Sequence, residues 1–397
     1  MRLSDVRYQV RAMRTIQQAI RAERLAHAYV FHGPGGVGKE MFARGLAALL
    51  LCSQSEDSAV DAEEVGAVGV NSVRRGCGNC VECRLVAAGT HPDYHLIHRL
   101  LHREHPDADV RRRKGVDLGV DVVRCFVIDR VGFRPSRGRA KVFILRDADT
   151  MSDQAQNALL KTLEEPPGST VLILLVENLS ALLPTTLSRS QIVRFDPLPN
   201  SFIEERLRNL RPGLSSELLR WYARVGDGSL GLALRFADTD LHSLNQAIVG
   251  DLQSLIASTV PAKGTGRRNR VHPDVVAKSW VEQAASVGEK LKDPDSEITD
   301  AEASRRGLSV ILRLAADGCA DMLRHVVGEN SRSGSDEFDS KGAAIDAETL
   351  ATAIERIGQT ERQLDLNAHV QLCVDALLND LARALGPKQK QTARATV

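Results

Sequence analysis

One short segment of the chain combines the residue types that bind phosphate. The run GPGGVGK at 33–39 fits the P-loop pattern, in which backbone N–H groups surround phosphate oxygens and the lysine reaches the β- and γ-phosphates. The next residue, Glu40, carries a carboxylate where the pattern has Ser or Thr. That hydroxyl binds Mg²⁺ in a working site, so the sequence predicts a nucleotide-binding scaffold that is impaired in hydrolysis. The candidate nucleotide-binding residues are Gly33, Gly35, Gly36, Gly38, Lys39 and Glu40.

A group of cysteines indicates a metal site. Cys77, Cys80 and Cys83 follow one another at the spacing of a tetrahedral metal knuckle, and thiolates favour Zn²⁺. We expect Cys52 to be the fourth ligand, since it ends the predicted helix that follows the P-loop run. The polar loop between Cys52 and Cys77 can close at little extra entropic cost. Four thiolates would make a closed, structural Zn²⁺ site. Ordinary surface thiols and a redox pair are the alternatives, and three cysteines at two-residue intervals favour the metal.

Alternating strands and helices position these groups. The sequence predicts strands at 28–32, 141–145 and 171–176, and helices at 39–51 and 153–165. A strand, a glycine-rich turn and a helix are the context that a P-loop requires. Strands that alternate with helices predict an α/β domain with a parallel sheet. Beyond Phe195 the pattern becomes helical and stays so, apart from polar interruptions at 262–269 and 328–342 and a polar tail at 386–397.

Composition narrows the class of protein. The chain has 397 residues, a net charge of +1 and 43% hydrophobic residues, which is enough for two or three domains. We find no signal peptide and no apolar run long enough to cross a bilayer, so a cytosolic protein is expected. The basic runs at 111–114 and 267–270 are interpreted as solvated loops, with contact to DNA as the alternative.

Several motifs in fixed order resemble the bacterial replicative clamp loader, an AAA+ assembly of the DNA polymerase III holoenzyme. They are the P-loop run at 33–39, the four cysteines, GTHPD at 89–93, NALLKTLEEPP at 157–167 and Ser188-Arg189. The resemblance covers about residues 1–235 and implies three domains. These are an AAA+ domain at 1–197 (a RecA-like parallel sheet with helices on both faces) with an inserted zinc module at 52–83, a small helical lid at 198–240, and an all-α collar at 241–397 with a flexible tail, which builds a ring of five subunits.

Two kinds of clamp-loader subunit share these motifs, the gamma/tau ATPase and the delta-prime kind, which does not hydrolyse ATP. Three positions indicate the second kind. Glu40 replaces the Mg²⁺-binding hydroxyl, and Arg146-Asp147 stands where the ATPase has the Asp-Glu pair of Walker B. Gly231 stands where the ATPase has an arginine that senses the γ-phosphate. Phosphoryl transfer relies on Mg²⁺, a carboxylate and a cationic clamp, so this resemblance implies a degenerate site. Binding of ATP or ADP without turnover remains open.

The pair Ser188-Arg189 is retained. In the resembled family it lies toward the next subunit, and its arginine enters that subunit's ATP site as a finger in trans. Such fingers increase the rate about 10³–10⁵-fold in related NTPases. The alternative is an arginine in an ordinary surface salt bridge. The resemblance favours the finger, with Arg189 and Ser188 as catalytic residues toward a neighbour.

The resemblance also implies partners. These are the gamma/tau ATPase and the delta subunit, and, through the complex, the sliding clamp and primer–template DNA. Two other functions stay open at this point. One is a gamma/tau-type ATPase, which the three altered positions oppose. The other is a stand-alone, zinc-containing DNA-binding protein, which salt-sensitive DNA binding without partner subunits would favour.

Overall fold

The structure is a computed structural model that describes residues 3–59, 72–113, 115–137, 139–259, 272–292, 299–327, 347–365 and 368–384. The chain divides into two compact units. The first comprises 1–206, 227–232 and 294–297, and the second comprises 207–226, 233–293 and 298–397. The two polar interruptions, the tail and the middle of the 52–83 module lie largely outside the described residues. The domain boundaries expected at 197 and 240 stay predictions.

The first unit is built on five parallel strands in the order β4-β5-β6-β1-β7. The strands are β1 Ala28–His32, β4 Tyr94–Ile97, β5 Lys141–Leu145, β6 Thr170–Val176 and β7 Gln191–Arg194. The central strands β1, β5 and β6 are buried almost throughout, as expected when helices cover both faces of a sheet. The sequence did not predict the edge strands β4 and β7. Each has four residues, and β7 buries only Val193, so neither carries a strong apolar signal.

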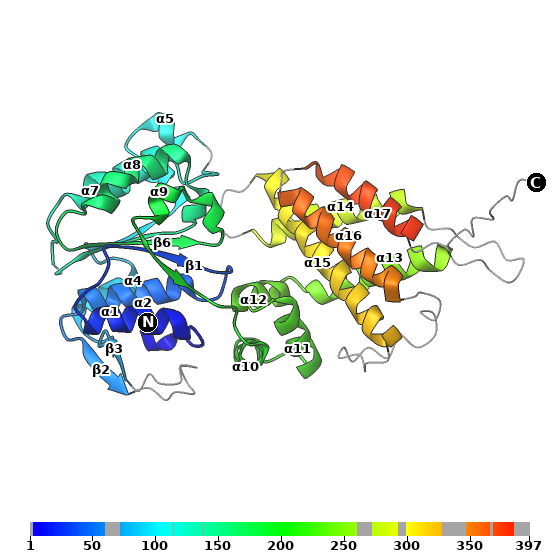
Figure 1. The fold of residues 1–397 in the computed structure, drawn as a ribbon, viewed down its shortest axis with the longest axis horizontal. Coiled ribbons are helices and arrows are strands. Elements are labelled where there is room, and N and C mark those ends of the chain that lie inside the picture. Colours follow the sequence, from blue (N-terminus) through cyan, green and yellow to red (C-terminus); the bar gives the residue numbers. More distant parts are fainter. Residues whose placement is uncertain are drawn as a thin grey trace, which may run out of the picture. The chain divides into compact units, whose positions relative to one another are not determined.

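Helices cover both faces of this sheet (Figure 1). Helices α1, α2 and α4 lie on one face, and α7, α8 and α9 lie on the other. The helices of this part of the chain are α1 Val10–Arg21, α2 Lys39–Leu51, α4 Val81–Ala88, α5 Ala108–Arg111, α6 Val120–Val123, α7 Asp129–Val131, α8 Asp153–Glu164 and α9 Pro184–Leu187, and α10 Asn200–Leu210 follows. A small antiparallel pair, β2 Glu56–Ala59 and β3 Ser72–Arg75, stands apart from the main sheet. The predicted α/β class with a parallel sheet is confirmed.

Aromatic packing fixes the strand and the helix on either side of the glycine-rich loop. The rings of Phe31 on β1 and Phe42 on α2 lie 5.6 Å apart, and Phe195 lies 5.2 Å and 5.3 Å from them. All three side chains are fully buried. Edge-to-face and tilted aromatic contacts of this kind add to the stabilisation from burial. The elements that hold the loop are therefore anchored in the core of the unit.

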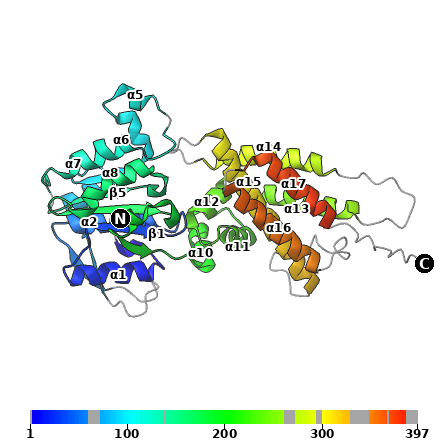
Figure 2. The same cartoon turned by 45° about the horizontal axis from the view of Figure 1, so that its top comes forward.

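The second unit is helical. Its helices are α11 Ser216–Val225, α13 Leu241–Thr259, α14 Pro273–Lys290, α15 Asp300–Val327, α16 Ala347–Asp365 and α17 Val370–Ala384, and α12 Leu230–Asp238 begins in the first unit. Helix α15 packs against α13, α14 and α16, and the long helices lie side by side in both views (Figure 2). Helices α14 and α15 cross closely at Gly288 and Gly307, where a Cβ atom would overlap the facing backbone. The predicted helical C-terminal region is confirmed.

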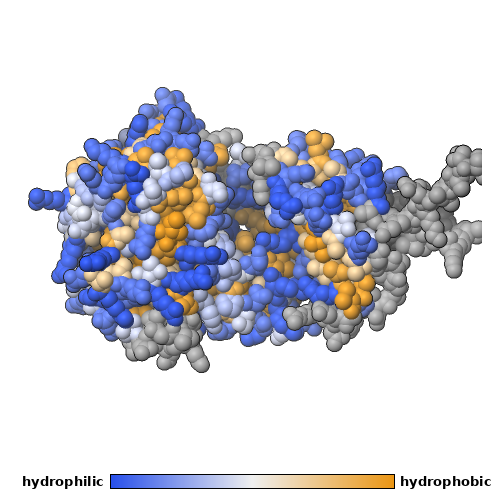
Figure 3. All heavy atoms as spheres, viewed as in Figure 1, coloured by the Kyte–Doolittle hydropathy of each residue, from blue (hydrophilic) through white to orange (hydrophobic). Residues whose placement is uncertain are grey.

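The surface is mainly hydrophilic in the view of Figure 3, with apolar residues gathered in smaller areas. In the first unit, the large apolar side chains that are exposed include Val81, Phe133 and Ile192. Among the helices that the structure describes, none has the combination of length and apolar character that a membrane span needs.

Candidate functional site

The glycine-rich loop lies between a strand and a helix, as the P-loop pattern predicts. It follows β1 directly and leads into α2, whose first residue is Lys39. Gly36 and Gly38 have φ angles of 69° and 100°, which residues with a side chain rarely adopt. Gly36 and Gly38, two of the four glycines that the sequence singled out in this loop, thus occupy positions where the backbone favours glycine.

The ammonium group of Lys39 donates hydrogen bonds to carbonyl oxygens of its own loop. Its Nζ donates to the carbonyl oxygens of Gly33 at 2.5 Å and Pro34 at 2.7 Å, and the residue is 8% exposed. Burial lowers the pKa of Lys39, while the carboxylates of Glu177 and Asp149 oppose that shift. A phosphate would have to replace these carbonyl contacts to reach the ammonium group.

An acidic residue that the sequence reasoning missed lies against the loop. Glu177 directly follows β6, and a Cβ atom added at Gly35 would overlap its carboxylate. Asp149 accepts hydrogen bonds from the backbone N–H groups of Glu177 at 2.9 Å and Asn178 at 3.2 Å. A signal for Glu177 existed, because carboxyl ends of parallel strands meet at the edge where α/β proteins bind ligands. Negative charge beside the loop opposes a bound phosphate.

The two residues at the predicted Mg²⁺ positions bind each other. Arg146, at the end of β5, donates from Nε to Glu40 Oε2 at 2.9 Å and from Nη2 to Glu40 Oε1 at 3.0 Å. Arg44 adds a contact of 2.6 Å to the same carboxylate. The side chains of Arg146 and Glu40 are 22% and 29% exposed. A bidentate ion pair of this kind is directional and charge-assisted, so it uses the oxygens that a metal ion would need.

Asp147, the second residue of the predicted Walker B pair, lies near a different arginine. Its carboxylate lies 3.9 Å from Nε of the buried Arg99. Its backbone has φ of 51°, a left-handed conformation that aspartate tolerates better than most residues with a side chain. Arg146 and Asp147, which the sequence placed in one motif, therefore contact different charged partners, Glu40 and Arg99.

Gly231 lies directly on the loop. Its N–H donates to the carbonyl oxygen of Gly36 at 3.3 Å, and a Cβ atom at position 231 would stand 3.0 Å from Gly36 Cα. Both residues belong to the first unit. A side chain at 231 would force the two backbones apart, so a glycine at this position permits the close contact with Gly36.

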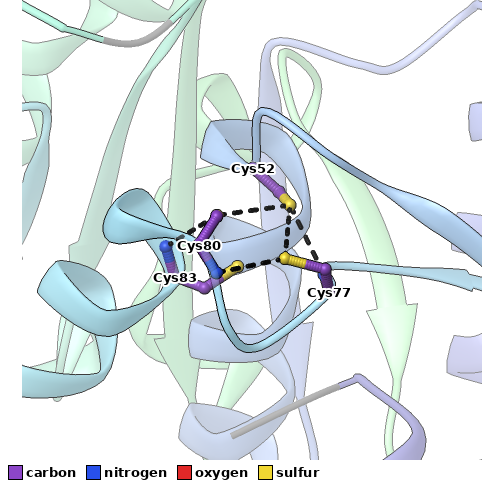
Figure 4. A group of neighbouring side chains, drawn as sticks. All are labelled: Cys52, Cys77, Cys80 and Cys83. Atoms are coloured by element: carbon purple, nitrogen blue, oxygen red, sulfur yellow. Dashed lines mark hydrogen bonds between the residues drawn. The ribbon is translucent and has the colours of Figure 1, made fainter.

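The four predicted cysteine ligands converge (Figure 4). Cys52 ends α2, Cys77 follows β3, and Cys80 and Cys83 begin α4; their sulfur atoms all lie within 4.8 Å of one another. The distance from Cys52 Sγ is 3.6 Å to Cys77 Sγ and 3.8 Å to Cys80 Sγ. A tetrahedral Zn²⁺ with Zn–S bonds of about 2.3 Å places its sulfurs about 3.8 Å apart. The donor set and its spacing fit Zn²⁺.

Backbone N–H groups surround the sulfurs. Cys52 Sγ accepts from Gln54 N at 3.3 Å and Cys77 N at 3.4 Å, and Cys80 Sγ accepts from Cys83 N at 3.4 Å. Burial raises the pKa of the Cys80 thiol, but hydrogen bonds, among them those from Cys83 and Ser53, outweigh it and lower that pKa to about 6. At Cys80 such donors stabilise the thiolate, which is the metal-binding form. Burial instead raises the pKa of the Cys52 and Cys83 thiols.

Ser188 and Arg189 follow the short helix α9. Arg189 contacts Glu164, the last residue of α8, and its side chain is 34% exposed. Ser188 Oγ donates to the carbonyl oxygen of Thr185 at 3.1 Å and accepts from Arg189 Nη1 at 3.2 Å. Arg189 is therefore accessible at the surface, and its hydrogen-bond partners differ from those of Lys39 and Glu40. No sequence pattern indicated Glu164 as the partner of Arg189, because the two residues are 25 positions apart.

Together, the fold and these contacts define an α/β domain whose glycine-rich loop connects β1 to α2. An ion pair between Glu40 and Arg146 lies beside the predicted nucleotide-binding residues. A family model described as DNA polymerase III, delta subunit, matches residues 8–199. The DNA polymerase III subunit delta' of Pseudomonas aeruginosa is 35% identical over 241 residues, which are 60% of this chain and 63% of that protein. The subunit delta' of Escherichia coli is 32% identical over 242 residues, 58% of this chain and 63% of that protein.

Subunit tau of Bacillus subtilis is also similar, at 27% identity over 383 residues, 94% of this chain and 60% of that protein. The chain thus spans less than two thirds of the length of each of these relatives. Residues 8–199 thus match the model of a DNA polymerase III subunit family, and the relatives at 35% and 32% identity are delta' subunits.

Proposed function

We propose that this chain is a clamp-loader subunit of the delta-prime kind, which does not hydrolyse ATP itself. It would help the complex to load a sliding clamp onto primer–template DNA during chromosome replication. Its partners would be the gamma/tau ATPase and the delta subunit, in the cytoplasm at the replisome. The family match of residues 8–199 supports this assignment.

The observation that carries the proposal is the ion pair between Glu40 and Arg146. In a P-loop ATPase the corresponding positions hold Mg²⁺, which neutralises charge on the transferred phosphoryl group. Here a cation stands at one position and the carboxylate at the other is bound to it. Without the metal, little remains to stabilise the transition state, so the loop serves as a fold element. Retention of ATP or ADP without turnover would depend on displacing the internal contacts of Lys39.

Arg189 would act outside its own chain. It lies at the surface with Ser188 beside it, as a residue must if it is to enter the ATP site of a neighbouring gamma/tau subunit. There its guanidinium would stabilise negative charge in the transition state. The cysteine cluster would hold one structural Zn²⁺ that fixes the end of α2 to the start of α4, with no open position for catalysis.

ATPase measurements test the proposal. The pure, isolated chain should hydrolyse no ATP, and the complex reconstituted with Arg189→Ala should lose turnover at the one ATP site that this chain faces. Arg112→Ala is the matched control, because Arg112 is an exposed arginine with an 80% exposed side chain. Hydrolysis by the isolated chain would favour the gamma/tau alternative. An unchanged rate with Arg189→Ala would contradict the finger.

A further inference from the structure

The guanidinium of Arg189 is bound by its own chain on several sides. Nε donates to Glu164 Oε1 at 2.7 Å, and Nη2 lies 2.6 Å from the same oxygen. Nη1 donates to the carbonyl oxygen of Thr185 at 3.0 Å and to Ser188 Oγ at 3.2 Å. Since a guanidinium has five N–H groups, these contacts use most of its donors before any partner arrives.

Glu164 is in an unusual place for a carboxylate. It is the last residue of α8, and the chain continues through Glu165 to Pro166, which cannot extend the helix. Negative charge is unfavourable at the C-terminal end of a helix, where the carbonyl dipoles point outward. A nearby cation offsets that repulsion, and Arg189 supplies it. The contact therefore stabilises the charges of both side chains, Glu164 and Arg189.

We propose that Glu164 is a positioning residue that holds Arg189 in a retained state, and we name this contact the Glu164–Arg189 latch. The inference rests on the proposed role of Arg189 as a finger. To contact a phosphate on a neighbouring subunit, the guanidinium exchanges the carboxylate of Glu164 for phosphate oxygens. The latch thus neutralises the charge of Arg189 while no phosphate is bound to it. It lowers the fraction of time in which the guanidinium is free to contact a phosphate on the neighbouring subunit.

The size of the effect follows from the exposure of the pair. The side chains of Arg189 and Glu164 are 34% and 49% exposed, so water and salt weaken their attraction. Pairs of this kind shift an equilibrium by about 1.5- to 5-fold. Removing the charge of Glu164 should therefore raise finger engagement by about that factor, with a smaller difference at high salt.

The test uses Glu164→Gln in the complete reconstituted complex. The amide oxygen still accepts a hydrogen bond from Arg189, while the negative charge is removed. ATPase activity should rise about 1.5- to 5-fold at low salt, and the difference from the unsubstituted complex should shrink as salt is added. Glu165→Gln is the matched control, since Glu165 is the adjacent exposed carboxylate, and it should leave the rate unchanged. The double variant with Arg189→Ala should behave as Arg189→Ala alone.

The outcomes separate the latch from the finger. If Arg189→Ala lowers the rate while Glu164→Gln leaves it unchanged or lowers it, the latch is wrong and the finger stands. If Arg189→Ala has no effect, both are wrong. A gain with Glu164→Gln that persists in the double variant would also overturn the latch, because the effect would not pass through Arg189. Thermal unfolding of each variant, and Glu164→Ala as a second substitution, separate these results from a loss of folding.

Discussion

Alanine at position 146 tests whether the ion pair with Glu40 replaces a metal as a structural element. The substitution removes two charge-assisted hydrogen bonds, of 2.9 Å and 3.0 Å, from a carboxylate that is 29% exposed. Fully exposed pairs contribute about 0–1 kcal/mol, and breaking a fully buried pair costs about 3–5 kcal/mol. This pair lies between these limits, and Arg44 still contacts Glu40. We therefore expect a coupling free energy of about 1–2 kcal/mol, between those two ranges.

A double-mutant cycle measures this coupling. Arg146→Ala, Glu40→Ala and the double variant are compared with the unsubstituted chain in thermal and urea unfolding, which isolates the pairwise term. For a unit of this size, each kcal/mol lowers the melting temperature by about 2–4 °C. Arg112→Ala is the control, because both side chains of its ion pair with Asp109 are 80% exposed, and it should change little. A coupling indistinguishable from that control, or an Arg146→Ala chain of increased stability, would refute the reasoning.

Two further predictions concern the metal site and the helical unit. Elemental analysis should find about one Zn²⁺ per chain. The Cys80→Ser variant should lose the Zn²⁺ and melt at a lower temperature. The Cys125→Ser variant, with its substitution outside the cluster, should keep the Zn²⁺ and the melting temperature of the unsubstituted chain. Burial raises the pKa of Asp251, which accepts a hydrogen bond from the Trp280 indole at 3.0 Å. The folded chain therefore binds this proton more tightly than the unfolded chain, and the stability it contributes is present at low pH and lost as pH rises through the raised pKa. Asp251→Asn keeps the acceptor and should weaken that pH dependence in urea unfolding; an unchanged profile would contradict it.

Local sequence patterns predicted the elements that carry the site. The glycines at 33–38, the strand before them and the helix after them are all neighbours in the chain, and the structure has β1 and α2 at the predicted bounds. The spacing of Cys77, Cys80 and Cys83 predicted three ligands of one metal site. Cys52 was predicted as the fourth ligand because it ends the helix after the glycine-rich loop. Such features depend on φ preferences, apolar spacing and ligand spacing, which a short segment contains in full.

The sequence did not reveal which charged side chains meet. Glu40 and Arg146 are 106 residues apart, and Glu164 and Arg189 are 25 apart. The edge strands β4 and β7 were missed for a related reason, since their short, partly polar sequences become strands by pairing with β5 and β1. Pairing and ion contacts depend on neighbours that only the folded chain provides.

By itself, the sequence showed a run that fits the P-loop pattern, a group of cysteines and several motifs that resemble those of a clamp-loader subunit, because each motif is a short segment that can be recognised without the fold. Only the tertiary structure decided that the altered Mg²⁺ positions form a bidentate pair, that Lys39 binds its own loop and that Arg189 is held by Glu164. The physical reason is that the parallel sheet brings the ends of β1, β5 and β6 to one edge, where charges from distant segments must either pair or repel.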